Sequence, residues 1–335
     1  MKVVTIRDVA REAGVSITTV SRVLNGREDV DDATRARVQQ VIERLRYMRN
    51  TNASSLKQRQ SNFIAVILRG RRNIFLTDLA ERVLAYGKDS GLQFLTEIID
   101  ERADEFLAAR RLHLERKLSG IVFLGSNLQG REKDIHRLDL PCVFATVDAS
   151  FLDAPRVASV SVDNYRSGFQ AARQLIDLGH RSIALLGYFS GPSDSTGQRL
   201  YGARAAMEAA GIPFDADLFS DSDFTLHTAW RATNELLARR KPFTALIAMS
   251  DTVAMGAAKA MFDHGVRVPQ DVSLVGFDGI EQGRYCTPSL ATMRQPSEEM
   301  ASMSIQLLRE MQQGNPGRHV LLDTEWLAGG SVRKH

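Results

Sequence analysis

The first 45 residues repeat their apolar positions with the spacing of short helices. In the segment 6–13 these positions fall at i, i+3, i+4 and i+7, so they share one helix face: Ile6, Val9, Ala10 and Ala13. Thr5 stands at the N-cap position of this helix, with Asp8 as the acid of a capping box. After a glycine turn, Ser16 can cap a second helix, and a third begins near Asp32. Two short helices joined by a tight turn, with a third behind them, predict a helix-turn-helix unit.

The second helix, residues 17–25, points its polar side chains away from its valines. Near its N-terminal half the outward positions are Ile17, Thr18, Ser21 and Arg22. A recognition helix places such positions against base edges in the major groove. Arg22 can contact guanine with two hydrogen bonds, Thr18 can hydrogen-bond or touch a thymine methyl group, and Ile17 can make only apolar contacts. Phosphate contacts, which position a protein without reading sequence, suit Ser16, Thr19 and the helix amides. A small helical bundle that binds another protein is the alternative.

Beyond residue 61, short aliphatic runs alternate with amphipathic segments. Strands are expected at 63–68, 93–98, 120–124, 143–147, 182–186, 245–249 and 273–277. Helices are expected in amphipathic stretches between them, such as 79–90, 165–178, 200–210 and 228–239. Alternating strands and helices predict parallel, doubly wound sheets, which bind ligands at the carboxyl ends of their strands.

The charge distribution divides the chain at the same place. Residues 1–60 hold twelve Lys and Arg against seven Asp and Glu, a net charge of +5, whereas the remainder carries −2. A basic head on a slightly acidic body is expected when one part binds a polyanion, although a basic solvated face gives the same count. The 335 residues are 44% hydrophobic and 25% charged, which suits two or three globular domains and excludes low-complexity disorder.

Targeting and redox signals favour a cytoplasmic protein. No apolar run approaches the roughly 18 residues of a membrane helix, and the run 245–249 is typical of the longest. Arg7 and Asp8 interrupt the N-terminus too early for a signal peptide. Cys142 and Cys286 are too few for a disulfide framework and fit a reducing compartment.

Several sequence blocks resemble the LacI/GalR family of bacterial transcription regulators. The head reads TIRDVAREAGVSITTVSRVLNG, followed by TRARVQQVIERLRY and NASSLK. Later blocks are SVDNYRSG, GHRSIALLG, SDTVAMGA, GVRVPQDVSLVGFD and TPSLATMRQP. All of them occur in the family's order and spacing, so the resemblance covers nearly the whole chain.

The resemblance implies a multidomain protein: a small all-α helix-turn-helix headpiece and an α/β periplasmic-binding-protein-like body of two doubly wound lobes. The headpiece is expected at 1–48, a hinge at 49–61 and the body at 62–330. Within the body, the N-lobe is expected at 62–162 and 293–322, and the C-lobe at 163–291 and 323–330. An effector cleft is expected between the lobes.

The resemblance also implies a role for the hinge. Taken alone, the polar segment 50–60 reads as a linker. In the family it folds on operator DNA, and the leucine at the position of Leu56 is wedged into the minor groove, a device that bends DNA. Arg49 stands where a proline often follows the tyrosine, which leaves the affinity of this hinge open. The complete set of expected DNA contacts is Thr5, Ser16, Ile17, Thr18, Thr19, Ser21, Arg22, Asn25, Asn50, Ala53 and Leu56.

Carboxylates follow three of the expected strands and suit the hydroxyl groups of a sugar. By resemblance, Arg199 and Asp278 are the commonest ligand contacts, and the expected lining as a whole is Asn73, Phe75, Asp148, Arg199, Phe224, Ser250, Asp251 and Asp278. Helix capping is the alternative role for Asp163 and Asp251. Ser250 replaces a common asparagine. The basic loop LRGRRN, residues 68–73, leaves an anionic ligand open, although a solvated loop is the simpler interpretation.

No catalytic, metal or cofactor site is expected. The chain lacks GxGxxG after a strand, a Walker loop, GxSxG, HxxxH and CxxC, and its seven histidines are scattered at expected surface or helix-end positions. We therefore expect a dimeric repressor of operator DNA, released by a sugar or sugar derivative. The sequence leaves open a neutral sugar, a sugar acid, a sugar phosphate or a purine, and also the sign of the response. A periplasmic-type sugar-binding protein is the alternative, since its body would look the same.

Overall fold

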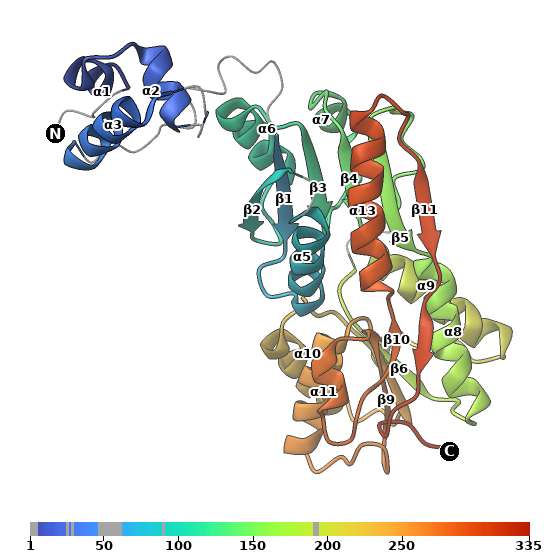
Figure 1. The fold of residues 1–335 in the computed structure, drawn as a ribbon. Helices are drawn as coiled ribbons and strands as arrows, with labels where there is room; N and C mark the ends of the chain where they lie inside the picture. Colours follow the sequence, from blue (N-terminus) through green and yellow to red (C-terminus); the bar gives the residue numbers. More distant parts are fainter. Residues whose placement is uncertain (1–5, 25–26, 28–29, 46–61, 89–90, 190–193) are drawn as a thin grey trace. The chain divides into compact units, whose positions relative to one another are not determined.

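The computed structural model describes residues 6–24, 27, 30–45, 62–88, 91–189 and 194–335. It divides into two compact units, Met1–Ser61 and Asn62–His335 (Figure 1). We call the first the headpiece and the second the body. None of the helices within the described ranges has the length and hydrophobicity needed to span a lipid bilayer.

The headpiece contains the three expected helices, α1 (Ile6–Ala13), α2 (Ile17–Leu24) and α3 (Asp32–Arg44). They enclose one small aliphatic core, formed by Val9, Ala10, Ala13, Val20, Val23, Val30, Val38 and Val41. The Ser16 Oγ caps α2 by accepting a hydrogen bond from the Thr19 amide at 3.0 Å, and the Asp31 carboxylate accepts from the Thr34 amide at 2.9 Å. The helix-turn-helix prediction is confirmed.

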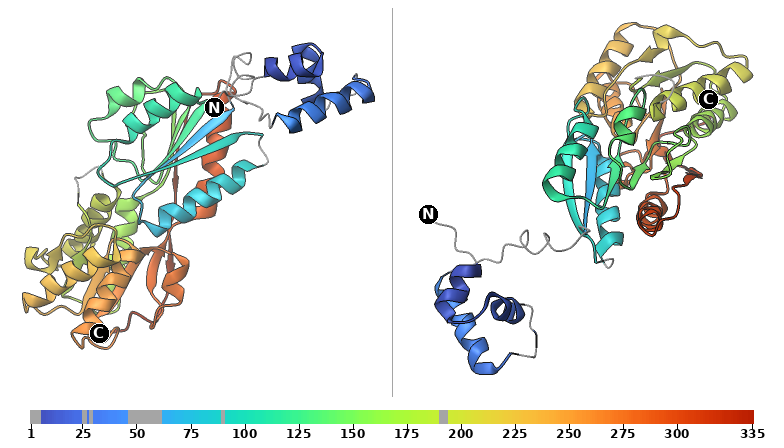
Figure 2. Two further views of the ribbon diagram at one scale, coloured as in Figure 1. Left: turned by 90° about the vertical axis from the view of Figure 1, so that its left-hand side faces the viewer. Right: turned by 90° about the horizontal axis from the view of Figure 1, so that it is seen from above.

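The N-lobe of the body is a six-stranded parallel sheet in the order β11-β5-β4-β3-β1-β2. Its strands are β1 (Phe63–Arg69), β2 (Gln93–Ile99), β3 (Gly120–Leu124), β4 (Cys142–Ala145), β5 (Val157–Val162) and β11 (His319–Leu322). Its helices are α5 (Ile74–Gly87), α6 (Glu105–Arg116), α7 (Glu132–His136) and α13 (Ser297–Gln312). Separate apolar cores lie on the two faces of the sheet, one beneath α5 and α13 and the other beneath α6 and α7 (Figure 2).

The C-lobe repeats this three-layer arrangement around the strand order β12-β10-β9-β8-β6-β7. Its strands are β6 (Ile183–Leu186), β7 (Phe219–Ser220), β8 (Ala245–Ala248), β9 (Ser273–Asp278), β10 (Ala291–Arg294) and β12 (Glu325–Leu327), of which only β12 is antiparallel to its neighbour. Its helices are α8 (Asn164–Asp177), α9 (Ser195–Ala209), the 3₁₀ turn Ala216–Leu218, α10 (Leu226–Ala238), α11 (Asp251–Asp263) and α12 (Glu281–Arg284). The prediction of two doubly wound lobes is confirmed.

The chain passes between the two lobes three times. The crossings follow β5, β10 and β11, so both α13 and β11 return to the N-lobe after the C-lobe has been built (Figure 1). Because β10 pairs with β9 as far as Arg294, the second crossing lies slightly beyond the expected boundary at 292–293. The C-terminal residues stay with the C-lobe, where the His335 amide donates to the Leu178 carbonyl at 2.8 Å.

Several local predictions are wrong, and the helices expected to start at residues 79 and 200 begin at Ile74 and Ser195. The fourth strand ends at Ala145 and not at Val147, because Thr146 has a φ of 83°, which takes the backbone out of the sheet. His180 was expected at the surface or a helix end but is buried. Its ring nitrogens contact the Thr244 hydroxyl at 2.9 Å and the Arg333 carbonyl at 3.1 Å. These contacts make it a packed residue of the C-lobe.

Candidate functional site

The outward face of α2 has the exposure that base contacts require. Val20 and Val23 are buried, whereas Thr18 and Arg22 are exposed and the Ile17 side chain is 46% exposed. A large aliphatic side chain at the surface of so small a unit is available for apolar contact with a partner. Ser21 is half-buried, and the Ser16 and Thr19 hydroxyls hydrogen-bond to each other at 2.9 Å. Five expected DNA contacts lie outside the described residues: Thr5, Asn25, Asn50, Ala53 and Leu56.

A cavity of about 110 Å³ lies between the two lobes of the body. A single buried water needs roughly 10–15 Å³ by this measure, so the cavity holds a larger ligand. Its N-lobe wall is formed by Arg69, Gly70, Asn73, Phe75, Leu76, Glu101, Arg102, Gly125, Ser126, Asn127, Thr146 and Val147. Its C-lobe wall is formed by Tyr188, Asp194, Ser195, Thr196, Arg199, Asp223, Phe224, Asp278 and Gln295. The structure thus brings together five of the eight expected effector residues: Asn73, Phe75, Arg199, Phe224 and Asp278.

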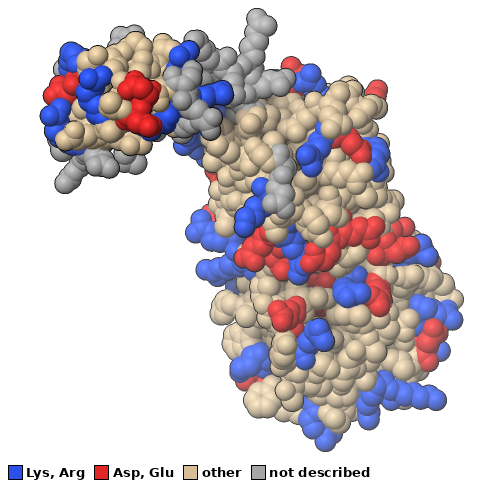
Figure 3. All heavy atoms as spheres, viewed as in Figure 1, with Lys and Arg blue, Asp and Glu red and all other residues tan. Residues whose placement is uncertain are grey.

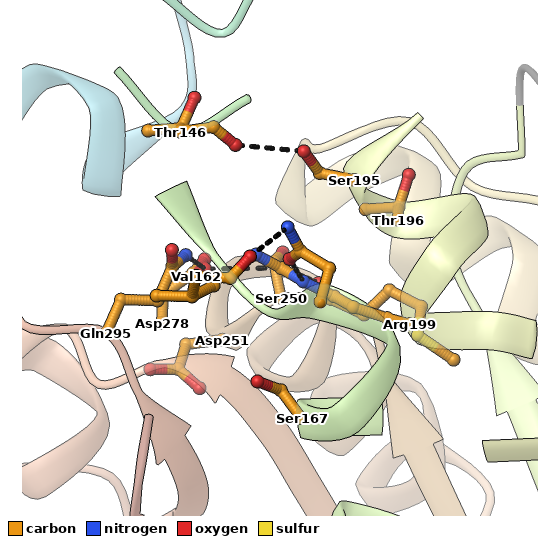
Figure 4. Close-up of polar contacts among 12 residues, drawn as sticks. Thr146, Val162, Ser167, Ser195, Thr196, Arg199, Ser250, Asp251, Asp278 and Gln295 are labelled. Atoms are coloured by element: carbon orange, nitrogen blue, oxygen red, sulfur yellow. Dashed lines mark hydrogen bonds and ion pairs between the residues drawn. The ribbon is translucent and has the colours of Figure 1, made fainter. Parts of the chain in front are cut away.

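The Arg199 guanidinium is held in place by contacts on most of its edge. Its Nε donates to the Asn164 Oδ1 at 2.9 Å, and its Nη1 donates to the Met249 carbonyl at 2.7 Å and lies 3.4 Å from the Asp278 Oδ1 (Figure 4). The group also stacks on the Phe277 ring, with 3.8 Å from Cζ to the ring centroid. Burial lowers the pKa of Arg199, and Asp278 opposes that shift. Its Nη2 has no hydrogen-bond partner among the described residues and remains for a ligand.

Two glycines allow α9 to approach α8 closely enough to place Arg199. A Cβ on Gly168 would lie 2.0 Å from the Arg199 carbonyl oxygen, and one on Gly202 would lie 1.9 Å from the Tyr165 carbonyl oxygen. Neither distance is possible for a real side chain, so the backbones of the two helices touch at these positions. The position of Arg199 is therefore set by backbone contact as well as by its own hydrogen bonds.

Asp278 lies at the carboxyl end of β9 with a φ of 111°, a conformation that is uncommon for a residue other than glycine. Its Oδ1 accepts from the Gln295 Nε2 at 2.8 Å and lies 3.4 Å from the Arg199 Nη1, while its Oδ2 accepts no side-chain hydrogen bond from the described residues. Burial raises the pKa of Asp278, and the Arg199 charge lowers it. Together, Arg199 and Asp278 present one donor group and one acceptor atom to the cavity.

The other three expected effector residues lie outside the cavity wall. Ser250 is the N-cap of α11, where its Oγ accepts from the Val253 amide at 3.1 Å. The exposed Asp148 accepts from the amide and the hydroxyl of Ser150, both at 2.9 Å. Each of these side chains is therefore engaged with its own loop or helix terminus. Likewise Asp163 caps α8 by accepting from the Arg166 amide.

Asp251, fully buried, supports the turn that follows Asp278. Its Oδ2 accepts from the Gly279 and Ile280 amides at 2.7 and 2.8 Å, and its Oδ1 accepts from the Thr292 hydroxyl at 2.6 Å. Burial raises the pKa of Asp251, and the neighbouring Asp278 charge raises it further. These contacts fix the turn that presents Asp278 to the cavity, so Asp251 positions a site residue without lining the site.

Thr146, Ser195 and Gln295 line the cavity without having been expected there. The Ser195 Oγ donates to the Thr146 carbonyl at 2.9 Å, which joins α9 of the C-lobe to the end of β4 in the N-lobe (Figure 4). The Thr146 Oγ1 accepts from the Gly125 amide at 3.2 Å. The positive φ of Thr146 turns its carbonyl out of the sheet, and neither composition nor periodicity reveals such a turn in advance.

Glu105 is a buried acid that sits behind the cavity wall. Its Oε1 accepts from the Asn127 amide at 3.2 Å, its Oε2 has no hydrogen-bond partner, and the Arg69 Nε lies 4.0 Å away. Burial raises the pKa of Glu105 to about 7, and the Arg69 charge opposes this only in part. Arg69 also donates to the Gly125 carbonyl at 3.3 Å, so its charge is engaged within the N-lobe.

We expect Glu105→Gln to stabilise the body at pH 8 but not at pH 5. A folded-state pKa above the unfolded value means that ionisation costs stability progressively from roughly pH 4.5 to pH 7, and Gln removes that cost. The gain at pH 8 relative to pH 5 should be about 1–3 kcal/mol, since Gln still accepts the Asn127 hydrogen bond. Urea unfolding at both pH values measures it, with the exposed Glu208→Gln as control. An equal gain at both pH values would contradict the burial of this charge.

The described residues contain no group of three or more His, Cys, Asp or Glu side chains able to hold a metal ion. Cys142 is buried, and burial raises its pKa to about 12, so its thiol behaves as an apolar group.

Comparisons with known proteins find relatives of both the headpiece and the body. The family described as "Bacterial regulatory proteins, lacI family" matches residues 5–50, and "Periplasmic binding protein-like domain" matches residues 172–332. The HTH-type transcriptional regulator MalR of Clostridium butyricum is 33% identical over 96% of each chain. A solved transcriptional regulator CelR–cellobiose complex aligns at 27% identity with a TM-score of 0.71, covering 98% of this chain and 99% of that one. The lac repressor dimer bound to operator and the anti-inducer ONPF has the same fold, with a TM-score of 0.77 at 24% identity over 99% and 100% of the two chains. The curated relative is a transcriptional regulator and not an enzyme.

Proposed function

The chain belongs to the LacI family of bacterial regulatory proteins, and on that premise we propose that it is a dimeric repressor released from its operator by a sugar or sugar derivative. As a member of this family it is a DNA-binding transcriptional regulator with an effector-binding domain. The proposal adds that the effector releases DNA, that the effector is a sugar or sugar derivative, and which residues contact DNA and effector. The observation that carries it is the cavity between the lobes, where Arg199 and Asp278, each only 5% exposed, present unused hydrogen-bonding atoms.

We assign sequence reading to α2. Arg22 contacts guanine, Thr18 contacts a base edge, and Ile17 packs against a thymine methyl group. Ser21 lies beside them, and Ser16 and Thr19 lie near phosphates with the N-terminal amides of α2. Thr5, Asn25, Asn50, Ala53 and Leu56 complete the proposed interface, with Leu56 as the minor-groove wedge.

We assign effector binding to residues of both lobes. Arg199 and Asp278 bind neighbouring hydroxyl groups of the ligand, one as donor and the other as acceptor. Phe75 from the N-lobe and Phe224 from the C-lobe supply apolar walls. Asn73 caps α5 through its Oδ1 and offers its Nδ2 to the ligand. A ligand held from both sides favours the closed arrangement of the lobes, because only that arrangement makes all of its contacts.

The proposed oligomer is a homodimer joined through the bodies. A two-fold pair of headpieces reads a pseudo-palindrome whose half-sites lie about one helical turn apart. Phe262 and Tyr285, which are 78% and 77% exposed, are large side chains of the C-lobe that a partner subunit can cover. Lobe closure then moves the origins of the two hinges and releases DNA. Because its operator is bacterial chromosomal DNA, the protein works in the cytoplasm.

We expect Arg22→Ala to lose roughly 1–3 kcal/mol of specific operator binding per half-site and to relax base preference at one position. The physical reason is the loss of a two-point hydrogen bond to guanine. Gel shifts with the DNA upstream of the protein's own gene, and with single-base substitutions of that DNA, measure both effects. The matched control is Arg11→Ala, because Arg11 is an exposed arginine on α1 that pairs with Asp8. Equal weakening on every sequence would show a phosphate contact and contradict the assigned role.

A further inference from the structure

The cations inside the cavity are already engaged by groups of the protein. Arg199 is paired with Asp278 and also donates to Asn164 and Met249, and Arg69 donates to the Gly125 carbonyl beside Glu105. Arg102 is the one lining cation for which the described residues supply no partner, and it is exposed. The charge of the buried Arg199 is therefore already compensated by Asp278, so its free Nη2 offers a ligand a hydrogen-bond donor without an unpaired positive charge.

Three carboxylate positions of the cavity wall are free to accept hydrogen bonds. The carboxylates of Glu101 and Asp223 line the cavity and have no hydrogen bond or ion pair among the described residues. The Asp278 Oδ2 is likewise unused. Carboxylates accept hydrogen bonds and cannot donate them, so these three positions require hydrogen-bond donors on the ligand. Phosphate and carboxylate groups supply no donors when ionised.

The dipoles of the neighbouring helices do not make the cavity favourable for an anionic ligand. The N-termini of α5 and α9 both reach the cavity, and a free helix N-terminus attracts anions. At α9, however, the Asp194 carboxylate already accepts from the Gly197 amide at 3.3 Å and adds a full negative charge. On the face of the body drawn in Figure 3, Asp and Glu side chains gather in a band across its middle. At the N-terminus of α9, an anionic ligand would therefore face the negative charge of Asp194.

An aromatic pair lies beside one of the free acids. The rings of Tyr188 and Phe224 are tilted by 55° with their centroids 6.2 Å apart, and Asp223 directly precedes Phe224. Aromatic faces bind the C–H faces of sugar rings and also attract cations. A hydroxyl group and an ammonium group of a ligand can each donate a hydrogen bond to the Asp223 carboxylate in this corner of the cavity.

We infer that the cavity selects a polyhydroxyl ligand without an anionic group and tolerates an amino group in place of a hydroxyl. This inference rests on the proposed function, because it concerns the ligand of the same site. It excludes sugar phosphates and sugar acids, which the basic loop 68–73 had left open. Arg71 lies outside the cavity wall and 3.8 Å from the Asp100 carboxylate at the surface, and Arg72 is exposed.

The test is a binding panel on the full-length protein, read by thermal shift and titration calorimetry. For the gluco, galacto and manno series it compares the hexose, the hexosamine, the hexonate and the hexose 6-phosphate, with cellobiose and maltose as larger neutral sugars. We expect the binding compounds to be neutral or amino sugars, at least tenfold tighter than their phosphate or acid counterparts. An anionic compound that binds as tightly as its neutral counterpart overturns the inference. Binding of hypoxanthine or guanine instead, or of no sugar, overturns it as well.

Variants of the free acids test the physical cause. Glu101→Gln and Asp223→Asn each remove a negative charge from the cavity. In each variant, the affinity for a neutral sugar divided by the affinity for its anionic counterpart should fall at least threefold. The control Glu208→Gln removes an exposed carboxylate of α9 that does not line the cavity, and should leave the ratio unchanged. An unchanged ratio in both cavity variants contradicts the inference. Gel shifts on operator DNA without ligand keep this outcome separate from a failure of the proposed DNA-binding function.

Discussion

Replacing Asp278 by alanine should abolish the ligand response of this regulator while its operator binding persists. The Asp278 carboxylate is a buried acceptor of the cavity. Its Oδ1 contacts both the Arg199 guanidinium and the Gln295 side-chain amide, so it helps to hold both groups in place. Loss of a buried hydrogen bond to a charged group, together with the misplacement of Arg199, should weaken ligand binding by about 2–4 kcal/mol, roughly 30- to 1000-fold. Titration calorimetry with a ligand that releases the wild-type protein from operator measures the loss, and gel shifts measure operator binding.

Two further variants separate ligand binding from folding. Asp278→Asn keeps the shape of the side chain and an acceptor for Gln295, so the body remains folded, but it exchanges the free Oδ2 for a donor. We expect it to lose ligand affinity almost as severely as the alanine variant. The control is Glu208→Ala on the exposed face of α9. Full ligand sensitivity in both Asp278 variants, with unchanged affinity, would remove Asp278 from the proposed site.

Gly168→Ala should destabilise the C-lobe and weaken ligand binding at the same time. The added methyl group would lie 2.0 Å from the Arg199 carbonyl oxygen, so α8 and α9 must separate. Overpacking of this kind costs about 2–4 kcal/mol of unfolding free energy, even after the roughly 1 kcal/mol that alanine gains over glycine within a helix. Denaturant unfolding and calorimetry measure the two effects.

Gly283→Ala on α12 provides the matched control for the glycine substitution. Its Cβ would lie 3.5 Å from the Leu290 Cβ, an ordinary contact, and its stability should equal that of the wild type or exceed it slightly. If Gly168→Ala were as stable as Gly283→Ala, close approach of the helix backbones would not set the position of Arg199.

Sequence patterns predict the elements that bury aliphatic side chains close together in the chain. The segment 120–124 is predicted at its observed bounds as β3, the second headpiece helix begins after its predicted cap Ser16, and the third begins at Asp32 as expected. The strand β5 was missed, since two of its six buried residues are serines, Ser159 and Ser161, which dilute the apolar signal. The crossings after β10 and β11 depend on pairing between strands far apart in sequence, which local periodicity does not encode.

The sequence predicts the cavity at Arg199 by resemblance, and at Asp278 by resemblance together with its place at the end of a strand. Asp148 and Asp251 also follow strands but do not line the cavity, because Asp148 accepts from the Ser150 amide of its own turn and Asp251 accepts from the Gly279 and Ile280 amides of the turn after β9. Gln295 and Ser195 went unnoticed, because their roles come from partners 17 and 49 residues away that only the folded chain brings close. Chemistry in the sequence identifies polar groups, and the tertiary fold decides which of them a ligand can reach.

The threefold crossing of the chain between the lobes also governs the order in which the protein can fold during synthesis. The N-lobe lacks both the α13 cover of one sheet face and its edge strand β11 until residues 297–322 have been synthesised, which is after every strand of the C-lobe except β12. The headpiece, whose core is complete by residue 45, has no such dependence. A nascent or prematurely terminated chain therefore presents a finished DNA-binding unit before any ligand-responsive body exists. For this architecture, translation through β11 is a condition of regulation, because α13 and β11 complete a lobe whose synthesis began with β1.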